Sequence, residues 1–516
     1  MRIIDFFDRG AALHPDRLFL KSERAQRTYR ETQAFSRRVA GGIVAAGLAR
    51  DAKIGVYSGN DVVAFECAIG IVRSGRVWVP INARNAVEAN THLVQTFDVE
   101  GIFFHSDYEA QIEQMRASCP GVRFWVCIDR PGANAPSLQR WLESATALPE
   151  TDAPPDLEET AVLFPTGGTT GHSKGAIWTH RVFASLTASY FIAMPATAPP
   201  VHLVAAPLTH AAGVFALMLS AVGATNIILD HADPLLVMET IHRERVTRLF
   251  LPPTVIYMML AHPRVREFDY SSLEYFVYAA APMSADKLRE AIAVFGPVMT
   301  QVYGQAEAPI MLTYLGPEEH KPDDPVAAAR LLSCGRPSML GRLEIMDDDG
   351  RILASGERGE IVARGDIVMR GYYRSPEATA EASKFGWHHT GDVGYKDDDG
   401  FVYIVDRKKD MIISGGFNVY PGEIEQVIWG HPAVQDCAVI GVPDDKWGEA
   451  VKAVVELKAD GKVTGDELIA LCKERLGSVK APKSVEFWPV LPRTPVGKVQ
   501  KKEIRATFWQ GRSRAI

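Results

Sequence analysis

The sequence predicts an α/β protein with a largely parallel sheet, followed by a smaller β-rich segment and a compact α+β segment. Three observations support this. Helical and strand patterns alternate over most of the chain, the composition changes near residue 335, and a run of five residues at 406–410 contains only charged side chains. Alternating helices and strands are typical of a parallel sheet covered by helices. At 516 residues the chain should form at least two domains.

The elements of the first part follow from hydrophobic periodicity. Apolar residues that recur every three or four positions indicate helices, and short runs rich in β-branched and aromatic residues indicate strands. The pattern predicts helices at 32–48 and 62–74, and strands at 53–57, 77–80, 248–251 and 275–278.

The segment after residue 335 has a different composition. Residues 341–405 are rich in Gly, Asp and short β runs, which predicts a small distorted barrel or a meander. The charged run 406–410 suits an exposed joint. Beyond it, helices are expected near 421–429 and 465–476.

Composition excludes several classes of protein. A formal net charge of −7 argues against general nucleic-acid binding, which needs a basic face. The six cysteines show no CxxC spacing, so we expect neither a zinc site nor a disulfide framework, and a cytoplasmic location. The N-terminus lacks an apolar signal core. Residues 182–229 contain no Asp, Glu, Lys or Arg, but prolines, His210 and Asn226 interrupt them. We therefore expect a buried helix and strand there rather than an integral membrane segment.

The loop from Phe164 to Ala176 carries the strongest chemical signal. It places four glycines, three threonines, Ser173 and Lys174 directly after an apolar run. Glycines let successive backbone N–H groups turn toward one anion, and hydroxyls and Lys174 add donors and positive charge. The loop matches neither a Walker A motif nor GxGxxG. It predicts a polyphosphate site, the alternative being a flexible surface turn.

Four more motifs follow this loop along the chain. They are Tyr303-Gly-Gln-Ala-Glu307, Gly386-Trp-His-His-Thr-Gly-Asp392, Asp406-Arg407 and Pro492-Arg-Thr-Pro-Val-Gly-Lys498. Together with the loop they resemble the adenylate-forming superfamily of acyl-CoA synthetases, aryl-CoA ligases, amino-acid adenylation domains and luciferases. The resemblance covers residues from about 20 to 505. It implies an N-terminal adenylation domain, 1–405, of αβαβα layers plus the small barrel, and a mobile C-terminal lid domain, 406–516.

The resemblance also implies which residues bind ATP and Mg²⁺. Tyr303 would stack on adenine, Asp392 would bind the ribose, and Arg407 would reach the ribose or phosphate. Glu307 and Thr170 would hold Mg²⁺. For the charged residues the alternatives are a solvated or turn position. The full set is Thr166, Gly167, Gly168, Thr169, Thr170, Gly171, Lys174, Ala280, Ala281, Pro282, Tyr303, Gly304, Gln305, Glu307, Asp392 and Arg407.

Other positions are matched to catalysis and domain movement. Lys498 corresponds to the lysine that stabilises charge during adenylation, and Asp406 to the hinge. Gly415 and Gly416 correspond to the path of the coenzyme A pantetheine, although a plain turn would explain them as well. His210 matches a gate near the acyl carboxylate; a buried core histidine is the alternative.

These matches predict an ATP-dependent acid–CoA ligase that acts on a fatty or bulky hydrophobic acid. No Asp stands beside His210 to hold a substrate amine, which argues against amino acids. The apolar residues Val214, Phe215, Met218, Tyr257 and Met258 suit a hydrophobic acid, although each could be core. An aryl-acid CoA ligase and an enzyme that loads a carrier protein stay open, as does a homodimer. Two departures from the family pattern are Ala306, where threonine is usual, and Gly167, where serine is common.

Overall fold

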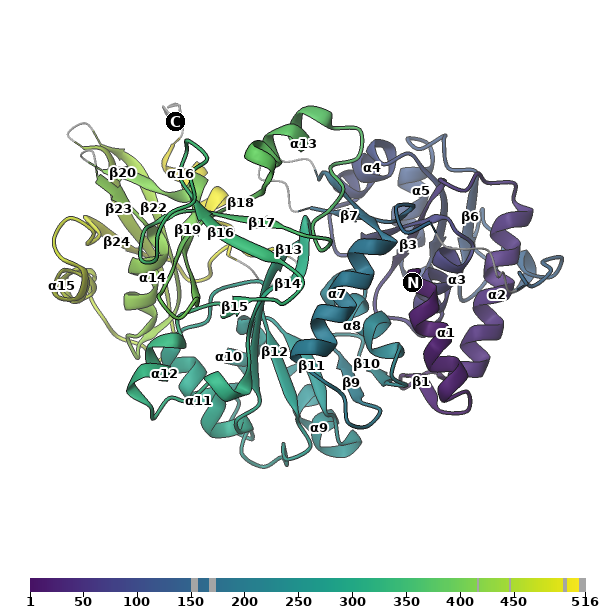
Figure 1. Cartoon of the computed structure of the whole chain (residues 1–516), viewed down its shortest axis with the longest axis horizontal. Helices are drawn as coiled ribbons and strands as arrows, with labels where there is room; N and C mark the ends of the chain where they lie inside the picture. The colour runs from purple at the N-terminus through teal and green to yellow at the C-terminus, as the bar shows by residue number, and fades with distance from the viewer. Residues whose placement is uncertain (150–155, 167–172, 415–416, 445–446, 495–498, 510–516) are drawn as a thin grey trace.

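The computed structural model describes residues 1–149, 156–166, 173–414, 417–444, 447–494 and 499–509 (Figure 1). In Figure 1 the N-terminal third lies at one end of the molecule and the C-terminal segment lies at the other. The long middle part of the chain connects them.

A six-stranded sheet, counted over the described residues, forms the N-terminal end. Its order is β6-β5-β3-β4-β7-β8, parallel throughout except for the antiparallel β7–β8 hairpin. The strands are β3 (Lys53–Ser58), β4 (Val77–Asn82), β5 (Val99–Phe104), β6 (Phe124–Cys127), β7 (Thr160–Pro165) and β8 (Gly175–Thr179). Its helices are α1 (Ile3–Leu13), α2 (Tyr29–Ala45), α3 (Val62–Arg73), α4 (Val87–Thr96), α5 (Glu109–Arg116) and α6 (Leu138–Trp141).

A nine-stranded sheet forms the middle of the molecule, again counting only described residues. Its order is β15-β14-β13-β12-β11-β9-β10-β1-β2, with parallel pairing from β13 to β1 and antiparallel pairing at both edges. The strands are β1 (Leu18–Lys21), β2 (Gln26–Thr28), β9 (Val201–Val204), β10 (Thr225–Ile228), β11 (Arg248–Leu251), β12 (Tyr275–Tyr278), β13 (Met299–Gln305), β14 (Ala308–Leu315) and β15 (Arg336–Pro337). Its helices are α7 (His180–Ala193), α8 (Ala211–Ser220), α9 (Pro234–Glu244), α10 (Pro253–Ala261), α11 (Ala285–Phe295) and α12 (Pro325–Arg330).

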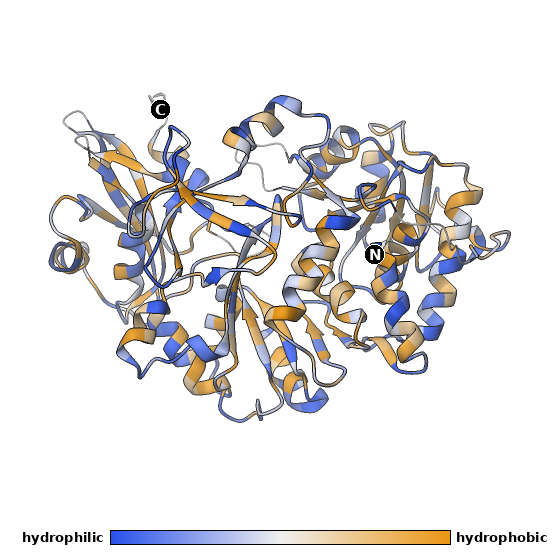
Figure 2. Ribbon diagram, in the orientation of Figure 1, coloured by the Kyte–Doolittle hydropathy of each residue, from blue (hydrophilic) through white to orange (hydrophobic). Residues whose placement is uncertain are grey.

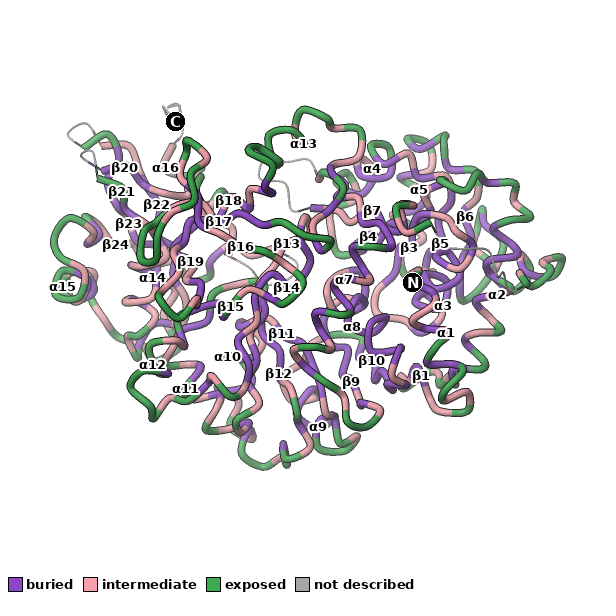
Figure 3. The backbone as a smooth tube through the Cα atoms, in the orientation of Figure 1, coloured by how far each residue is buried: buried purple, intermediate pink, exposed green. Residues whose placement is uncertain are grey.

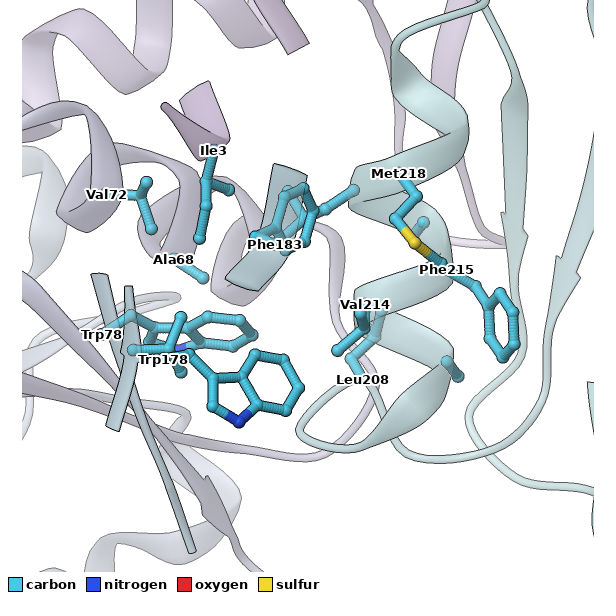
Figure 4. Packing of buried hydrophobic residues seen from close by; sticks show 14 of the residues in the cluster. Ile3, Ala68, Val72, Trp78, Trp178, Phe183, Leu208, Val214, Phe215 and Met218 are labelled. Carbon is cyan, nitrogen blue, oxygen red and sulfur yellow. The ribbon is translucent and has the colours of Figure 1, made fainter. Parts of the chain in front are cut away.

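The two sheets share one apolar core. Figure 4 shows side chains of α1, α3, α7 and α8 meeting there, among them Ile3, Ala68, Phe183 and Phe215. Separate clusters pack α4 and α5 on one sheet and α9, α10 and α11 on the other. Helices therefore lie between the sheets and outside them, which confirms the αβαβα layers. Figure 3 shows strands largely buried and outer helical faces exposed, and the hydropathy in Figure 2 follows the same division.

Local signals fix where the helices begin. Thr28 and Glu31 form a reciprocal capping box at the start of α2. The Asp61 carboxylate accepts from the Ala64 N–H at the start of α3, and the Thr179 hydroxyl accepts from the Val182 N–H at the start of α7. The uncharged stretch 182–229 contains most of α7 together with β9, α8 and β10. Within the described chain, no helix combines the length and the apolar character needed to cross a bilayer.

The β-rich segment is a meander, one of the two forms expected. β16 (Arg342–Met346), β17 (Gly359–Arg364), β18 (His388–Lys396) and β19 (Val402–Arg407) pair antiparallel in chain order. The short helix α13 (Pro376–Ala382) precedes β18. The meander places Asp392 and Arg407 opposite each other on adjacent strands.

The C-terminal segment is a small α+β unit. Its strands are β20 (Ile412–Ser414), β21 (Phe417–Val419), β22 (Val434–Asp444), β23 (Gly448–Leu457) and β24 (Ser484–Phe487). Its helices are α14 (Pro421–Trp429), α15 (Gly465–Leu476) and α16 (Lys501–Phe508).

The joint is only partly the exposed run that its charge suggested: Lys408 and Lys409 are exposed, but Asp406 is buried. Asp406 and Arg407 belong to β19, and Asp406 is only 9% exposed. The Asp406 carboxylate accepts from the backbone N–H groups of Arg407 and Gly422, each at 2.7 Å. Since these bonds satisfy the buried charge, its burial is tolerated.

Candidate active site

Asp392 is the meeting point of three motifs. Its carboxylate accepts a hydrogen bond from the Tyr303 hydroxyl at 2.6 Å and pairs with the Arg407 guanidinium at 2.7 Å. The Asp392 residue is buried, whereas 40% of the Arg407 side chain is exposed. Burial and the adjacent carboxylate raise the pKa of Tyr303, so this hydroxyl stays protonated and donates. The residues predicted to hold adenine and ribose therefore lie together.

The hairpin β13–β14 carries the residues between Tyr303 and Glu307. The Gln305 amide donates to the Thr390 carbonyl at 3.1 Å, which ties the hairpin to β18. Gly304 lies against the returning strand: a Cβ there would come within 2.4 Å of the Ile310 nitrogen. Only glycine fits this close approach.

Tyr372 links Glu307 to the end of the phosphate loop. Nothing in the sequence indicates this residue. The Tyr372 hydroxyl donates to Glu307 Oε1 at 2.7 Å, and the Lys174 ammonium lies 5.0 Å from the centre of the Tyr372 ring. A cation over an aromatic face at this distance is a favourable contact. The predicted metal ligand and the predicted phosphate-binding lysine are thus joined by one side chain.

The phosphate loop is described at its two ends. Thr166 is buried, and its N–H donates to the Lys174 carbonyl at 2.8 Å, which closes the base of the loop. The Ser173 hydroxyl donates to the Thr166 carbonyl at 2.7 Å. The predicted residues Gly167, Gly168, Thr169, Thr170 and Gly171 lie outside the described residues.

An aromatic group lies beside the loop. Phe164 stacks on Trp178 with centroids 4.7 Å apart, and His210 meets Phe164 edge-on at 6.3 Å. The Trp178 indole donates to the Ala306 carbonyl at 2.6 Å. Burial lowers the pKa of His210 to about 4, so its ring is neutral near pH 7. Trp178 belongs to the main apolar core and Phe164 packs against it, so the His210 ring has largely apolar surroundings.

The predicted ATP-binding segment Ala280-Ala281-Pro282 follows β12. Tyr278, the last residue of that strand, pairs with Gln301 of β13, so the segment begins close to the part of β13 that carries Tyr303, two residues beyond Gln301. Ala280 has φ +72°, a left-handed conformation that is rare for a residue with a Cβ. Strain of this kind concentrates at ligand sites.

The remaining predicted positions are divided between described and undescribed parts of the chain. Lys498, Gly415 and Gly416 lie outside the described residues. Lys501, three residues after Lys498, pairs with the buried Glu425 at 2.8 Å, so the start of α16 is held against α14. Of the apolar candidates, Val214, Phe215 and Met218 are core residues, whereas Met258 is 47% exposed.

Tyr372 and Trp178 are the residues that sequence reasoning missed. Both act on the Tyr303–Glu307 motif, yet Tyr372 lies 65 residues from Glu307 and Trp178 lies 128 from Ala306. The cue for Trp178 was its position in the strand that follows the loop. Tyr372 had no comparable cue, because the next residue is also a tyrosine and the sequence does not show which of the two contacts Glu307.

The described donors fit a magnesium-bound nucleotide. Mg²⁺ on a nucleotide takes one or two protein carboxylates and completes its shell with phosphates and water. No group of three or more His, Cys, Asp or Glu is set out for a metal in the described ranges. A metal that relies on Glu307 and on phosphate oxygens matches this donor set. The Asp392 carboxylate likewise suits two ribose hydroxyls.

Comparisons with known proteins identify the family of the chain. The model of the AMP-binding enzyme family matches residues 7–373, and that of its C-terminal domain matches residues 423–498. A feruloyl-CoA synthase from Amycolatopsis sp is 36% identical over 503 residues, which span 97% of this chain and 98% of that protein. The medium/long-chain-fatty-acid–CoA ligase FadD8 of Mycobacterium tuberculosis (strain ATCC 25618 / H37Rv) is 42% identical over 376 residues, 72% of this chain and 64% of that relative.

A solved structure gives the same result for the fold. The amide bond synthetase McbA from Marinactinospora thermotolerans superposes with a TM-score of 0.89 at 29% identity, covering 98% of this chain and 100% of that one. The chain belongs to the AMP-binding family of adenylate-forming enzymes and is an acid–thiol ligase of the acyl- and aryl-CoA ligase type.

Proposed function

We propose that this enzyme activates a fatty or other bulky hydrophobic carboxylic acid and transfers it to coenzyme A. The observation that supports this most is the aromatic corner at the loop: neutral His210 lies beside Phe164, which stacks on Trp178, and His210 belongs to a stretch of 48 residues, 182–229, that contains no Asp, Glu, Lys or Arg. An apolar acyl group would gain free energy by leaving water there, whereas a cationic substrate side chain would meet no carboxylate from this stretch and would be repelled by Arg84, whose charge acts on His210.

The reaction needs two steps because a carboxylate has no adequate leaving group. A carboxylate oxygen attacks the α-phosphorus of ATP, and pyrophosphate leaves, giving an acyl-adenylate. The coenzyme A thiol then attacks the acyl carbon, AMP leaves, and the thiol proton is released to solvent. Both ATP and coenzyme A are substrates in this scheme.

Different residues would have different roles in the first step, the formation of the acyl-adenylate. Tyr303, Asp392 and Arg407 would hold the adenosine, and Lys174 would face the phosphates. Glu307, with Thr170, would hold Mg²⁺, which neutralises charge on the triphosphate when bound. Lys498 would stabilise the negative charge that shifts between the acid and the α-phosphate. We also propose that Asp406 is the hinge of the C-terminal domain and that the boundary between the two domains lies between residues 405 and 406.

A second candidate is an aryl acid as substrate. The similarity to a feruloyl-CoA synthase over nearly the whole chain favours it, and the Phe164–Trp178 stack would accept an aromatic ring as readily as an alkyl chain. The acceptor is a separate question, since the similar structure McbA is an amide bond synthetase.

The test is pyrophosphate release with a panel of acids in the presence of ATP and Mg²⁺. The panel contains fatty acids of increasing length, cinnamic and benzoic acids, polycyclic acids and free amino acids. We expect release with hydrophobic acids, AMP as the nucleotide product, and background rates with amino acids. Coenzyme A, a phosphopantetheinyl carrier protein and an amine are then compared as acceptors. Fastest release with an amino acid, or an acyl product only with the carrier protein or the amine, would contradict the proposal.

A further inference from the structure

Tyr372 occupies a position between two oppositely charged residues of the nucleotide site. Its hydroxyl donates to Glu307 Oε1 at 2.7 Å, and its ring faces the Lys174 ammonium at 5.0 Å. Because Tyr372 contacts Oε1, the other oxygen of Glu307 is left for a further ligand. The tyrosine comes from neither hairpin that carries these charges.

The backbone around Tyr372 is fixed to both hairpins. Residues 369–372, which we call the strap, lie beside β8: the Arg370 N–H donates to the Ile177 carbonyl at 3.1 Å and the Ile177 N–H donates to the Gly371 carbonyl at 2.9 Å. At its other end the Met369 N–H donates to the Glu307 carbonyl at 2.7 Å. The strap therefore connects the strand after the phosphate loop with the residue that carries the metal-binding carboxylate.

The conformation of the strap is set by local packing. Gly371 has φ +150°, and a Cβ there would come within 2.7 Å of Thr379 Cγ2. The Thr379 hydroxyl accepts the Tyr372 N–H at 2.9 Å and donates to the Ser375 carbonyl at 2.9 Å. These contacts hold the backbone of Tyr372 in place, so its ring is aimed by the fold and not by the ligand.

The Tyr372 hydroxyl can act only as a donor toward Glu307. An ionised carboxylate has no proton to give, so the hydroxyl supplies the hydrogen of the 2.7 Å contact. A hydrogen bond to a carboxylate is stronger than one between neutral groups and restricts its rotation. The contact thus orients the carboxylate without removing its charge.

We propose that Tyr372 is a positioning residue for adenylation: its hydroxyl orients the Glu307 carboxylate toward the metal of the nucleotide while its ring holds the Lys174 ammonium at the phosphate side. The inference rests on the proposed function, because it assigns the orienting role within the same ATP site. Tyr372 acts on the metal-bound nucleotide through Glu307 and Lys174.

The variants Y372F and Y373F test it in the full-length enzyme. Y372F removes only the hydroxyl and keeps the ring. Y373F makes the same change at the next residue, whose hydroxyl binds Asp98 at 2.7 Å, away from Glu307. For Y372F we expect kcat/KM for ATP in pyrophosphate release to fall about tenfold, the size expected for one charge-assisted hydrogen bond. The Mg²⁺ concentration for half-maximal rate should rise, and Y373F should match the wild type.

Thioester formation, the second half-reaction, distinguishes a positioning role of Tyr372 from a role in the stability of the fold. Supplied with a synthetic acyl-adenylate, Y372F should form the coenzyme A thioester at the wild-type rate, because that step does not use the triphosphate. Equal losses in both half-reactions, with a lower melting temperature, would mean that the hydroxyl only supports the fold, and would overturn the inference. An unchanged Mg²⁺ dependence would also overturn it.

A double-mutant cycle with E307Q distinguishes the inference from the proposed function. If Tyr372 acts through Glu307, adding Y372F to E307Q should cause little further loss. If E307Q is impaired in adenylation but Y372F behaves as wild type, the inference fails and the proposed function stands. If E307Q itself is fully active in pyrophosphate release, the proposed nucleotide site is wrong and the inference fails with it.

Discussion

The contacts of Asp392 show how single residues define this site. The Asp392 carboxylate receives both the Tyr303 hydroxyl and the Arg407 guanidinium, and these three residues come from three different strands. The carboxylate is buried and lies 2.7 Å from the guanidinium, so the loss of its charge would leave Arg407 facing a neutral group at this position. We therefore expect the proposed binding of the nucleoside to depend strongly on the Asp392 carboxylate.

Replacement of Asp392 by asparagine tests that dependence. The amide keeps the size of the side chain but removes the charge, so we expect the KM for ATP in pyrophosphate release to rise about 10-fold or more, from the loss of hydrogen bonds to a charged acceptor. D366N is a matched control, since Asp366 has a side chain that is 64% exposed. Steady-state kinetics with varied ATP measures the effect. An ATP KM in D392N equal to that of D366N would contradict the role of Asp392.

At the scale of helices and strands, the sequence predicts most of the fold because local signals agree with tertiary packing. The predicted ranges 248–251, 275–278, 421–429 and 465–476 are the observed β11, β12, α14 and α15. α14 and α15 have clear signals at their ends: Pro421 stands in the first turn of α14, and Thr464 forms a capping box for α15. Strong local signals of this kind need no knowledge of distant residues.

Features that depend on distant contacts could not be predicted in the same way. The charged run at the joint gave no sign that Asp406 is buried, because its burial depends on the Gly422 N–H from the next segment. The choice between a barrel and a meander depends on whether the outer strands of the segment meet, which the strand patterns leave open. In the site, the motif residues were predicted from their resemblance, but the strap that joins them was not.

At the scale of the whole molecule, buried histidines make stability depend on pH. His202 and His320 are each 2% exposed and are hydrogen-bonded to Asn226 and Gly316. Burial lowers the pKa of each to about 4, below the ordinary value near 6.5. Between these values the unfolded chain binds more protons than the folded one, so stability is full above pH 6.5 and falls as the pH drops toward 4.

Urea unfolding at pH 8 and pH 5 tests this expectation. Each histidine should lower the free energy of unfolding by about 2 kcal/mol at pH 5. In H320Q the side chain cannot titrate, so the difference between the two pH values should shrink by about that amount. H231Q, at an exposed histidine, is the control. Equal pH dependence in wild type and H320Q would show that His320 does not contribute.

The central claim is that distant segments of the chain assemble one site in which a carboxylate attacks the α-phosphorus of ATP. The most direct measurement uses an accepted acid labelled with ¹⁸O in its carboxylate, followed by mass spectrometry of the nucleotide and phosphate products after thioester formation. We predict that one ¹⁸O atom appears in AMP and none in pyrophosphate. Label in inorganic phosphate, with ADP as the nucleotide product, would show attack at the γ-phosphorus and contradict the account.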